Sequence, residues 1–421
     1  MPREVLETAM ESHQRYFPLE SAEGTLTDGF IVAHNGDPDR TEAIVRGHER
    51  VIRARLADAA FFYDEDLKAN MEDWVERLET SVFHEKLGTL AAKTERIETL
   101  VGVLAEICGA GPDTSAAAVR AAHLAKADLV SHAVVEFPAL QGVMGRYYAL
   151  AAGEEPEVAD AILEHYRPRF AGDALPGSAA GMLLSAADKL DTICGIFAIG
   201  QGPTGSADPY ALRRSAIGVL AMILEGGLAI TLDRAIEASL ESYRDAASFE
   251  PADVGAAISA FFKGRLGVLL RDRGLAHDII SAVLLDNTVD DPADVLARAT
   301  ALTTMRASDA GADVLVAFKR AANLADPSAG VRPDATSMGP QEKALYEAVL
   351  GVRMDLSAAI TRRSYDEAIG LLASLRDPVD AFFEGVLVMD PDETVRHNRL
   401  ALLNMVIEPF AGFADLAALE G

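Results

Sequence analysis

The sequence predicts a mainly α-helical protein of several domains. The chain has 421 residues, of which 50% are hydrophobic but only 6% aromatic, and alanine and leucine are abundant. That composition favours helices over strands. Over most of the length, apolar residues recur every three or four positions, as on one face of an amphipathic helix. A chain of this length has room for two to four domains with their own cores.

Residues 1–63 contain the strands that the sequence predicts. Tyr16–Leu19 and Phe30–Ala33 are short apolar runs separated by polar, glycine-containing sequence, a pattern typical of a β-hairpin. From Asp37 onward the period becomes helical. One flank of that helix carries four arginines, Arg46, Arg50, Arg53 and Arg55. Such a flank can bind phosphate, but more often it is a solvated face paired with nearby acids.

Residues 64–207 are predicted to form a second, helical region. We expect helices over Asp64–Ser81 and Leu90–Ile107, and a third that is capped by Asp113–Ser115. Phe137-Pro138 predicts a break, since proline cannot continue a helix. A loop over Arg167–Ser178 precedes a last helix, Ala179–Ile196, that carries Asp188 and Asp191.

The stretch Gly200–Arg214 contains a GxGxxG pattern, which is common in dinucleotide-binding folds. Those folds need a strand directly before the glycines, whereas helical spacing precedes Gly200 here. Pro203 also stiffens the loop, and the carboxylate of Asp208 would lie where a phosphate should bind. We therefore interpret the stretch as a structural turn, with Asp208 as N-cap and Pro209 as the first residue of the next helix.

The remaining chain is predicted to form a helical body, residues 208–325, and a C-terminal helical domain, residues 340–421. A polar linker with two prolines, Asp326–Gly339, separates them. The helices expected in these regions are 232–247, His277–Leu285, 251–273, 293–306, Gln341–Arg353, Ser364–Ser374, Val379–Met389 and Asp392–Ile407.

Composition excludes several classes of function. The net charge of −27 argues against non-specific binding to nucleic acids or membranes. The longest apolar run, Ala216–Leu224, is too short to span a bilayer. Cys108 and Cys194 lie far apart without activating neighbours, which predicts reduced thiols and a cytoplasmic location. Neither a Walker loop nor a GxSxG motif occurs, and we expect no catalytic residue in this chain.

A metal-dependent phosphohydrolase of the HD type is the alternative that the residues leave open. Asp188 and Asp191 resemble the last metal-binding helix of such enzymes. The one His-Asp pair, His277-Asp278, follows that helix instead of preceding it. The metal site is therefore predicted to be incomplete, and no metal is expected.

Small basic clusters are the remaining candidates, because they can bind RNA locally despite the global charge. Taken singly, such clusters are more often solvated faces. The candidate tRNA-binding residues are Arg213, Arg214, Lys319, Arg320, Arg362, Arg363, Arg396, Asn398 and Arg399.

Long runs of the chain resemble the bacterial glycyl-tRNA synthetase beta subunit. The matching runs are 13–17 (HQRYF), 47–62 (GHERVIRARLADAAFF), 87–89 (LGT) with 93–97 (KTERI), 136–148 (EFPALQGVMGRYY), 187–191 (ADKLD), 200–214 (GQGPTGSADPYALRR), 379–383 (VDAFF) and 398–403 (NRLALL). They extend over essentially the whole chain.

The resemblance implies a heterotetramer of two alpha and two beta chains. In that family the alpha chain makes glycyl-adenylate from ATP and glycine, using Mg²⁺, and the beta chain binds tRNA-Gly. It implies no cofactor on this chain, a degenerate HD-like domain in the middle, and a C-terminal domain similar to the anticodon-binding domain of arginyl-tRNA synthetases. Family beta chains are longer, so the resemblance also implies that the family's N-terminal portion is absent here. A truncated remnant that binds neither partner is the third hypothesis.

Overall fold

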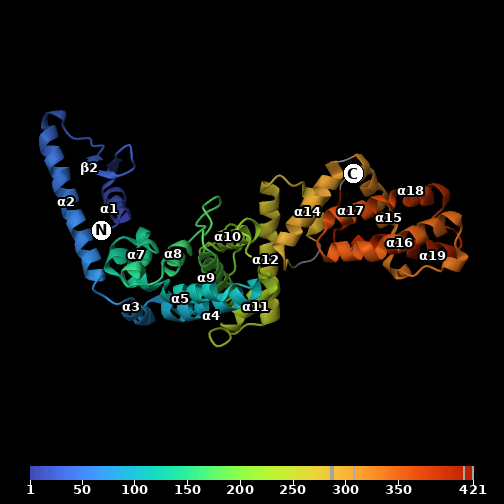
Figure 1. Ribbon diagram of the computed structural model, residues 1–421, viewed down its shortest axis with the longest axis horizontal. Coiled ribbons are helices and arrows are strands. Elements are labelled where there is room, and N and C mark those ends of the chain that lie inside the picture. Colours follow the sequence, from blue (N-terminus) through green and yellow to red (C-terminus); the bar gives the residue numbers. More distant parts are fainter. Residues whose placement is uncertain (285–288, 308, 411–412, 420–421) are drawn as a thin grey trace. The chain divides into compact units, whose positions relative to one another are not determined.

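The computed structural model describes residues 1–284, 289–307, 309–410 and 413–419. It divides into two compact units, Met1–Ile258 and Ser259–Gly421. Helices dominate both units, and the strands among the described residues form two small antiparallel sheets, as Figure 1 shows. The predicted fold class is thus confirmed, while the finer division into four domains stays a prediction.

The first unit is built from short helices and two hairpins. Its elements are α1 (Arg3–Gln14), β1 (Phe17–Glu20), β2 (Leu26–Ile31), α2 (Thr41–Asp66), α3 (Met71–Arg77), β3 (Val82–His84), β4 (Gly88–Thr89), α4 (Leu90–Cys108), α5 (Pro112–Leu124), α6 (His132–Glu136), α7 (Val143–Ala151), α8 (Pro156–Glu164), α9 (Ala179–Ala198), α10 (Leu212–Leu224) and α11 (Leu232–Glu241). Helix α12 (Pro251–Asp272) continues from this unit into the next.

The expected N-terminal hairpin is present, with Phe17 opposite Ile31. It packs on α1 and α2 through Tyr16, which contacts a small apolar cluster that includes Met10 and Ile52. Helix α1 was not predicted, and neither was the hairpin of β3 and β4.

Helix α9 forms the centre of the first unit and contacts α4, α5, α8, α10 and α11. Nearly all of its side chains are buried, including both aspartates to a large extent. Small residues allow this packing: a side chain at Gly195 would overlap the hydroxyl of Tyr243. Since α9 continues to Ala198, no strand precedes Gly200, and the expected helix is confirmed.

In the first unit, three predicted helix starts are wrong by several residues. The helix expected to begin at Asp64 is the end of α2, and α3 begins only at Met71, where the side chain of Asn70 accepts the amide of Glu72. Helix α5 begins at Pro112, before the expected cap, since proline needs no amide partner at a first helical position.

The start of α10 is the third correction. It lies at Leu212 instead of Pro209, after Ala211 in a left-handed conformation. The carboxylate of Asp208 still accepts the amides of Leu212 and Arg213, at 2.8 and 3.0 Å. Asp208 therefore caps the helix from across a turn.

The second unit consists of helices joined by short turns. They are α13 (His277–Val283), α14 (Pro292–Ala307), α15 (Asp309–Leu324), α16 (Pro340–Thr361), α17 (Tyr365–Ala373), α18 (Arg376–Gly385) and α19 (Glu393–Ile407). Helix α15 was not predicted, α16 runs eight residues past its expected end, and Leu285 of a predicted helix lies outside the described residues.

Apolar residues of α15, α16, α18 and α19 form the core of this unit, among them Phe318, Val349, Phe382 and Leu403. The linker 326–339 is fastened to α19 by Asn404, whose amide donates to the carbonyls of Asp326 and Gly330 at 2.6 and 2.7 Å. None of the described helices is both long and apolar enough to cross a membrane.

Candidate nucleic-acid interface

Three of the nine candidate residues lie on α19, and all three make contacts within the second unit. Arg399 is 17% exposed; it donates to Glu342 at 2.6 Å and to Asp390 at 2.7 Å. Asn398 binds the backbone of Asp334 through both its oxygen and its nitrogen. These side chains hold α16, α19 and the linker together.

Arg396 is the third candidate on α19. It is half-buried and donates to the carbonyl of Asp390 at 2.9 Å. This bond is to a neutral acceptor, but the charge of Arg396 also interacts with the carboxylate of Asp390, whose pKa it helps to lower, after the bonds from Asp392 and Arg399.

The end of α16 presents two further candidates to solvent. Arg362 and Arg363 have side chains that are 56% and 55% exposed. Arg362 pairs with Glu367 at 3.1 Å, and Arg363 pairs with Asp291 at 2.6 Å. The exposed pair of Arg362 contributes little to stability, so its guanidinium group is available to exchange partners. Arg363 also lies 3.5 Å from Asp294, and both of its carboxylate partners are partly buried.

Arg362 borders a shallow groove along α16 that sequence reasoning missed. The groove is lined by Arg353, Met354, Ser357, Ala358, Thr361 and Arg362. Met354 is 83% exposed, and Leu350, one turn before it, is 47% exposed. The helical spacing of these residues was visible in the sequence, but the predicted helix ended at Arg353.

Lys319 and Arg320 lie near the end of α15. The guanidinium of Arg320 stacks over the ring of Phe383, 4.3 Å from its centroid, and the residue is exposed. Lys319 is half-buried and has no ion pair among the described residues. A cation held flat on an aromatic ring keeps its outer face free for a phosphate or a base.

In the first unit, Arg213 and Arg214 occupy the first turn of α10, as predicted. Arg213 donates to the carbonyl of Gly205 and so closes the glycine-rich loop. Arg214 is exposed and unpaired among the described residues. The loop is further held by Tyr210, whose hydroxyl bonds Gln201 at 3.0 Å and His84 at 3.1 Å.

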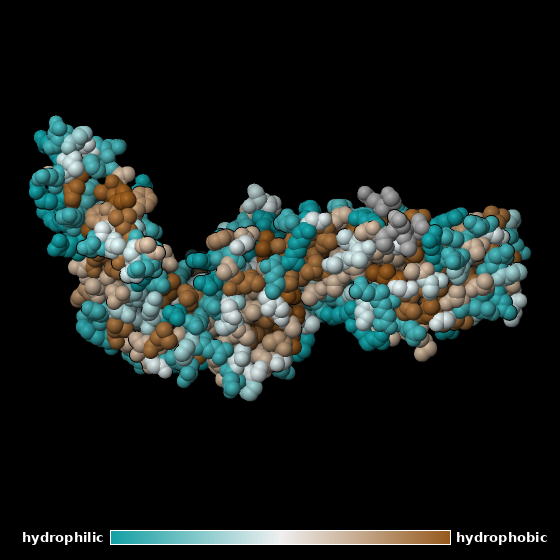
Figure 2. All heavy atoms as spheres, turned by 45° about the horizontal axis from the view of Figure 1, so that its top comes forward, coloured by the Kyte–Doolittle hydropathy of each residue, from teal (hydrophilic) through white to brown (hydrophobic). Residues whose placement is uncertain are grey.

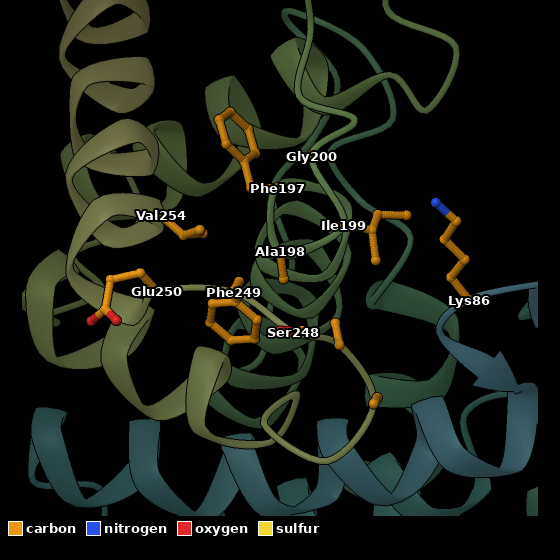
Figure 3. A pocket seen from close by; sticks show the side chains of 11 residues that line it. Lys86, Phe197, Ala198, Ile199, Gly200, Ser248, Phe249, Glu250 and Val254 are labelled. Atoms are coloured by element: carbon orange, nitrogen blue, oxygen red, sulfur yellow. The ribbon is translucent and has the colours of Figure 1, made fainter.

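A groove of about 700 Å³ lies beside this loop, at the end of α9. Its side chains are mainly apolar, among them Phe197, Ile199 and Phe249, and Figure 3 shows the charged Lys86 and Glu250 on opposite sides of it. The lining carries no pair of groups suited to acid–base or nucleophilic chemistry.

Buried charges around α9 bear on whether this chain could hold the metal of an HD-type hydrolase. The ammonium groups of Lys93 and Lys126 each lie 2.9 Å from the carboxylate of Asp188. Burial by itself would raise the pKa of Asp188, but these two ammonium groups hold it well below its usual value. Two positive charges thus occupy the space that a metal ion would need.

The other polar groups of this cluster are arranged around the same charges. Nε2 of His165 accepts from Lys126 at 2.8 Å, while its Nδ1 donates to the carbonyl of Ile162. Asp191, which resembled a second metal ligand, pairs with Lys93 at 2.8 Å and with Arg96 at 2.8 Å. The described residues contain no group of three or more side chains that is arranged to bind a metal.

The thiol of Cys194 is unsuited to nucleophilic catalysis. Cys194 is buried in α9, which raises its pKa to about 12, and Cys108 is half-buried. Both cysteines are free. A thiol that stays protonated at neutral pH is a poor nucleophile.

Comparison with known protein families identifies the family to which this chain belongs. A family model described as "Glycyl-tRNA synthetase beta subunit" matches residues 1–285. The chain belongs to the glycyl-tRNA synthetase beta subunit family. A second model, described as "DALR anticodon binding domain", matches residues 314–412. That match begins before residue 340, where we expected the C-terminal domain to start, and it includes α15 from residue 314 onward.

Individual members of the glycyl-tRNA synthetase beta subunit family are similar over the whole chain. The glycine–tRNA ligase beta subunit of Desulforudis audaxviator is 45% identical over 99% of this chain, and that of Clostridioides difficile is 42% identical over 99%. The chain spans 61% and 60% of those two proteins. The resemblance seen in the sequence is therefore confirmed.

The anticodon-binding match includes seven of the nine candidates. Within it, Arg320, Arg362 and Arg363 are exposed, while Asn398 and Arg399 serve the fold. Sequence alone did not separate these two groups.

Proposed function

We propose that this chain is the tRNA-binding part of a glycine–tRNA ligase and is not itself catalytic. In this proposal the chain binds tRNA-Gly and assembles with an alpha subunit. That subunit performs the ATP-dependent attachment of glycine and holds the ATP and Mg²⁺. The chain itself binds no cofactor, and the assembly works in the cytoplasm.

The observation that carries the proposal is the match of residues 314–412 to an anticodon-binding domain. Exposed cations lie within that match: Arg320, braced on Phe383, and Arg362, beside the groove of α16. Guanidinium groups next to open, partly apolar surface suit the phosphates and unstacked bases of an RNA loop.

A binding experiment tests the first part of the proposal. The affinity of the purified chain for a tRNA-Gly transcript is measured by fluorescence anisotropy between 50 and about 200 mM salt, a range over which phosphate contacts weaken steeply. We expect the double variant Arg320→Gln/Arg362→Gln to bind at least tenfold more weakly. Wild-type chain that fails to bind the transcript at low salt would overturn the proposal and favour a remnant without partners.

An aminoacylation experiment tests the second part. The chain is incubated with glycine, ATP, Mg²⁺ and tRNA-Gly, with and without the alpha subunit. Glycyl-tRNA is expected only when the alpha subunit is present. Product formed by this chain alone would contradict the assignment of the chemistry to alpha.

The phosphohydrolase alternative is weakened by the lysines around Asp188. It requires a tightly bound divalent metal. Elemental analysis of protein dialysed against Mn²⁺ and Zn²⁺ tests it directly, and one metal ion per chain would revive it.

A further inference from the structure

One face of α2 in the first unit carries a row of arginines that the proposed function does not use. Successive residues of a helix turn by about 100°, so Arg46, Arg50, Arg53, Ala57 and Phe61 fall within a sector of about 80°. We call this row the α2 stripe. It lies roughly opposite the buried residues Ile52 and Ala59, and therefore faces away from the rest of the unit.

The stripe is open to solvent along its length. All three arginines are exposed, as is Ala57, and the ring of Phe61 is 59% exposed. The upper left of Figure 2, where α2 begins, is mainly hydrophilic. From Arg46 to Phe61 the stripe is about 22 Å long, at about 1.5 Å per residue.

Acidic neighbours neutralise this row only at one end. Arg46 lies 3.6 Å from Glu42, and both side chains are largely exposed. Arg50 and Arg53 make no ion pair with any residue that the structure describes, although Glu49 lies on the adjacent flank. From Arg46 to Phe61 there are four arginines against Glu49 and Asp58, and one of the four, Arg55, pairs with Glu136, in a chain whose net charge is −27. Such local excess is unusual in an acidic protein and indicates an anionic partner.

Shape and chemistry favour a nucleic acid as that partner. Ala57 and the exposed Ala54 leave the helix surface flat between the arginines and Phe61, so a strand can approach closely. Guanidinium groups bind phosphates, and an exposed aromatic ring offers a face on which a base can stack. An acidic protein segment would use the arginines but has no need for the solvated ring.

We propose that the α2 stripe is a second RNA-binding surface, with Arg46, Arg50 and Arg53 on the backbone phosphates and Phe61 under one unpaired base. This inference rests on the proposed function for the identity of its ligand. It predicts contacts without sequence preference, because arginines on phosphates position an RNA but do not read it.

The test uses the whole chain and a tRNA-Gly transcript. Arg50→Gln/Arg53→Gln removes two charges from the stripe. Arg234→Gln/Arg271→Gln removes two exposed charges elsewhere that have no ion pair among the described residues. We expect the first variant to bind at least tenfold more weakly and to lower the salt slope, which is about 0.7 to 0.9 per phosphate contact, by nearly two contacts. The second variant should bind as the wild type does.

Two further variants separate charge from stacking. Phe61→Ala is expected to weaken binding about fivefold or more without changing the salt slope, because it removes a stacked base and no charge. The variant Arg50→Lys/Arg53→Lys should retain most of the wild-type salt slope, because lysine keeps the positive charge. Circular dichroism confirms in each case that the helices are intact.

The outcomes distinguish this inference from the proposed function. If the wild type binds the transcript and Arg50→Gln/Arg53→Gln binds equally well with the same slope, the stripe is not an RNA surface, while tRNA binding stands. A protein ligand captured by the stripe with no effect on RNA binding would overturn it in the same way. If the wild type binds no RNA, both proposals fail.

Discussion

The ammonium group of Lys126 lies 2.9 Å from the carboxylate of Asp188, although 62 positions separate the two residues in the chain. Burial lowers the pKa of Lys126, but the attraction of Asp188 opposes that shift. Asp188 resembled a metal ligand in the sequence, and in the structure it pairs with ammonium groups instead. The positive charge of a lysine side chain thus takes the place of the positive charge that a bound metal ion would supply.

Asp188→Asn is expected to destabilise the first unit strongly. The change leaves the ammonium groups of Lys93 and Lys126 buried with one carboxylate fewer, and breaking such a buried pair costs roughly 3 to 5 kcal/mol. Urea denaturation measures the free energy of unfolding. The exposed Glu106, changed to Gln, serves as control and should stay within about 0.5 kcal/mol of the wild type. Equal stability of both variants would contradict this account.

His165 is expected to make folding sensitive to acid. Burial, and then the charge of Lys126, lower its pKa well below the usual value. Below about pH 6.5 the unfolded chain therefore binds a proton on His165 that the folded protein does not bind. The free energy of unfolding should fall as the pH is lowered from 6.5 to 5, with a slope that approaches about 1.4 kcal/mol per pH unit.

The comparison with His165→Asn isolates this effect. Asp128 titrates in the opposite sense, because burial raises its pKa to about 6, and so the folded state gains a proton there as the pH falls. Asp128 is present in both proteins, so the difference between the two stability curves reports His165. Curves that remain parallel between pH 5 and 7.5 would refute the prediction.

Arg399 and Arg362 should respond differently to the same substitution. Arg399→Met leaves Glu342 without its partner inside the second unit, so we expect a loss of roughly 3 kcal/mol in stability. Arg362→Met removes only an exposed pair and should change stability by less than about 1 kcal/mol, while weakening tRNA-Gly binding. Thermal unfolding and anisotropy together check both halves. If the Arg399→Met protein kept its full stability but lost tRNA-Gly binding, our assignment of Arg399 to the fold would be wrong.

Gly195→Ala tests the close packing of α9. An added methyl group would lie 2.5 Å from the Tyr243 hydroxyl and 3.0 Å from Leu87, and such overpacking costs typically about 1 to 3 kcal/mol. Gly102 in α4 provides the matched control, since nothing lies within 4 Å of a methyl group there. Gly102→Ala should gain up to about 1 kcal/mol from helix propensity. Destabilisation by both variants would mean that packing is not the cause.

Much of the helical order was predictable because it is local. The period of apolar residues placed α4, α9 and α19 within a few residues of their bounds. The errors arose at helix ends, because a side chain that is distant in sequence can determine where a helix begins or ends. The side chain of Asp66, the last residue of α2, for example accepts the backbone amides of His132 and Ala133 at 2.9 Å, a contact that no local sequence pattern predicts.

By itself, the sequence determined the mainly helical class, the rejection of a dinucleotide loop at Gly200, and the family to which the chain belongs. These follow from periodicity and from long specific runs, which do not depend on how the chain folds back on itself. The tertiary structure alone decided which cations serve the fold and which face solvent. Arg399 and Arg362 are alike in sequence, but only Arg399 reaches a buried carboxylate, Glu342, 57 positions away. Ion pairs form in space, and their partners cannot be inferred from neighbours along the chain.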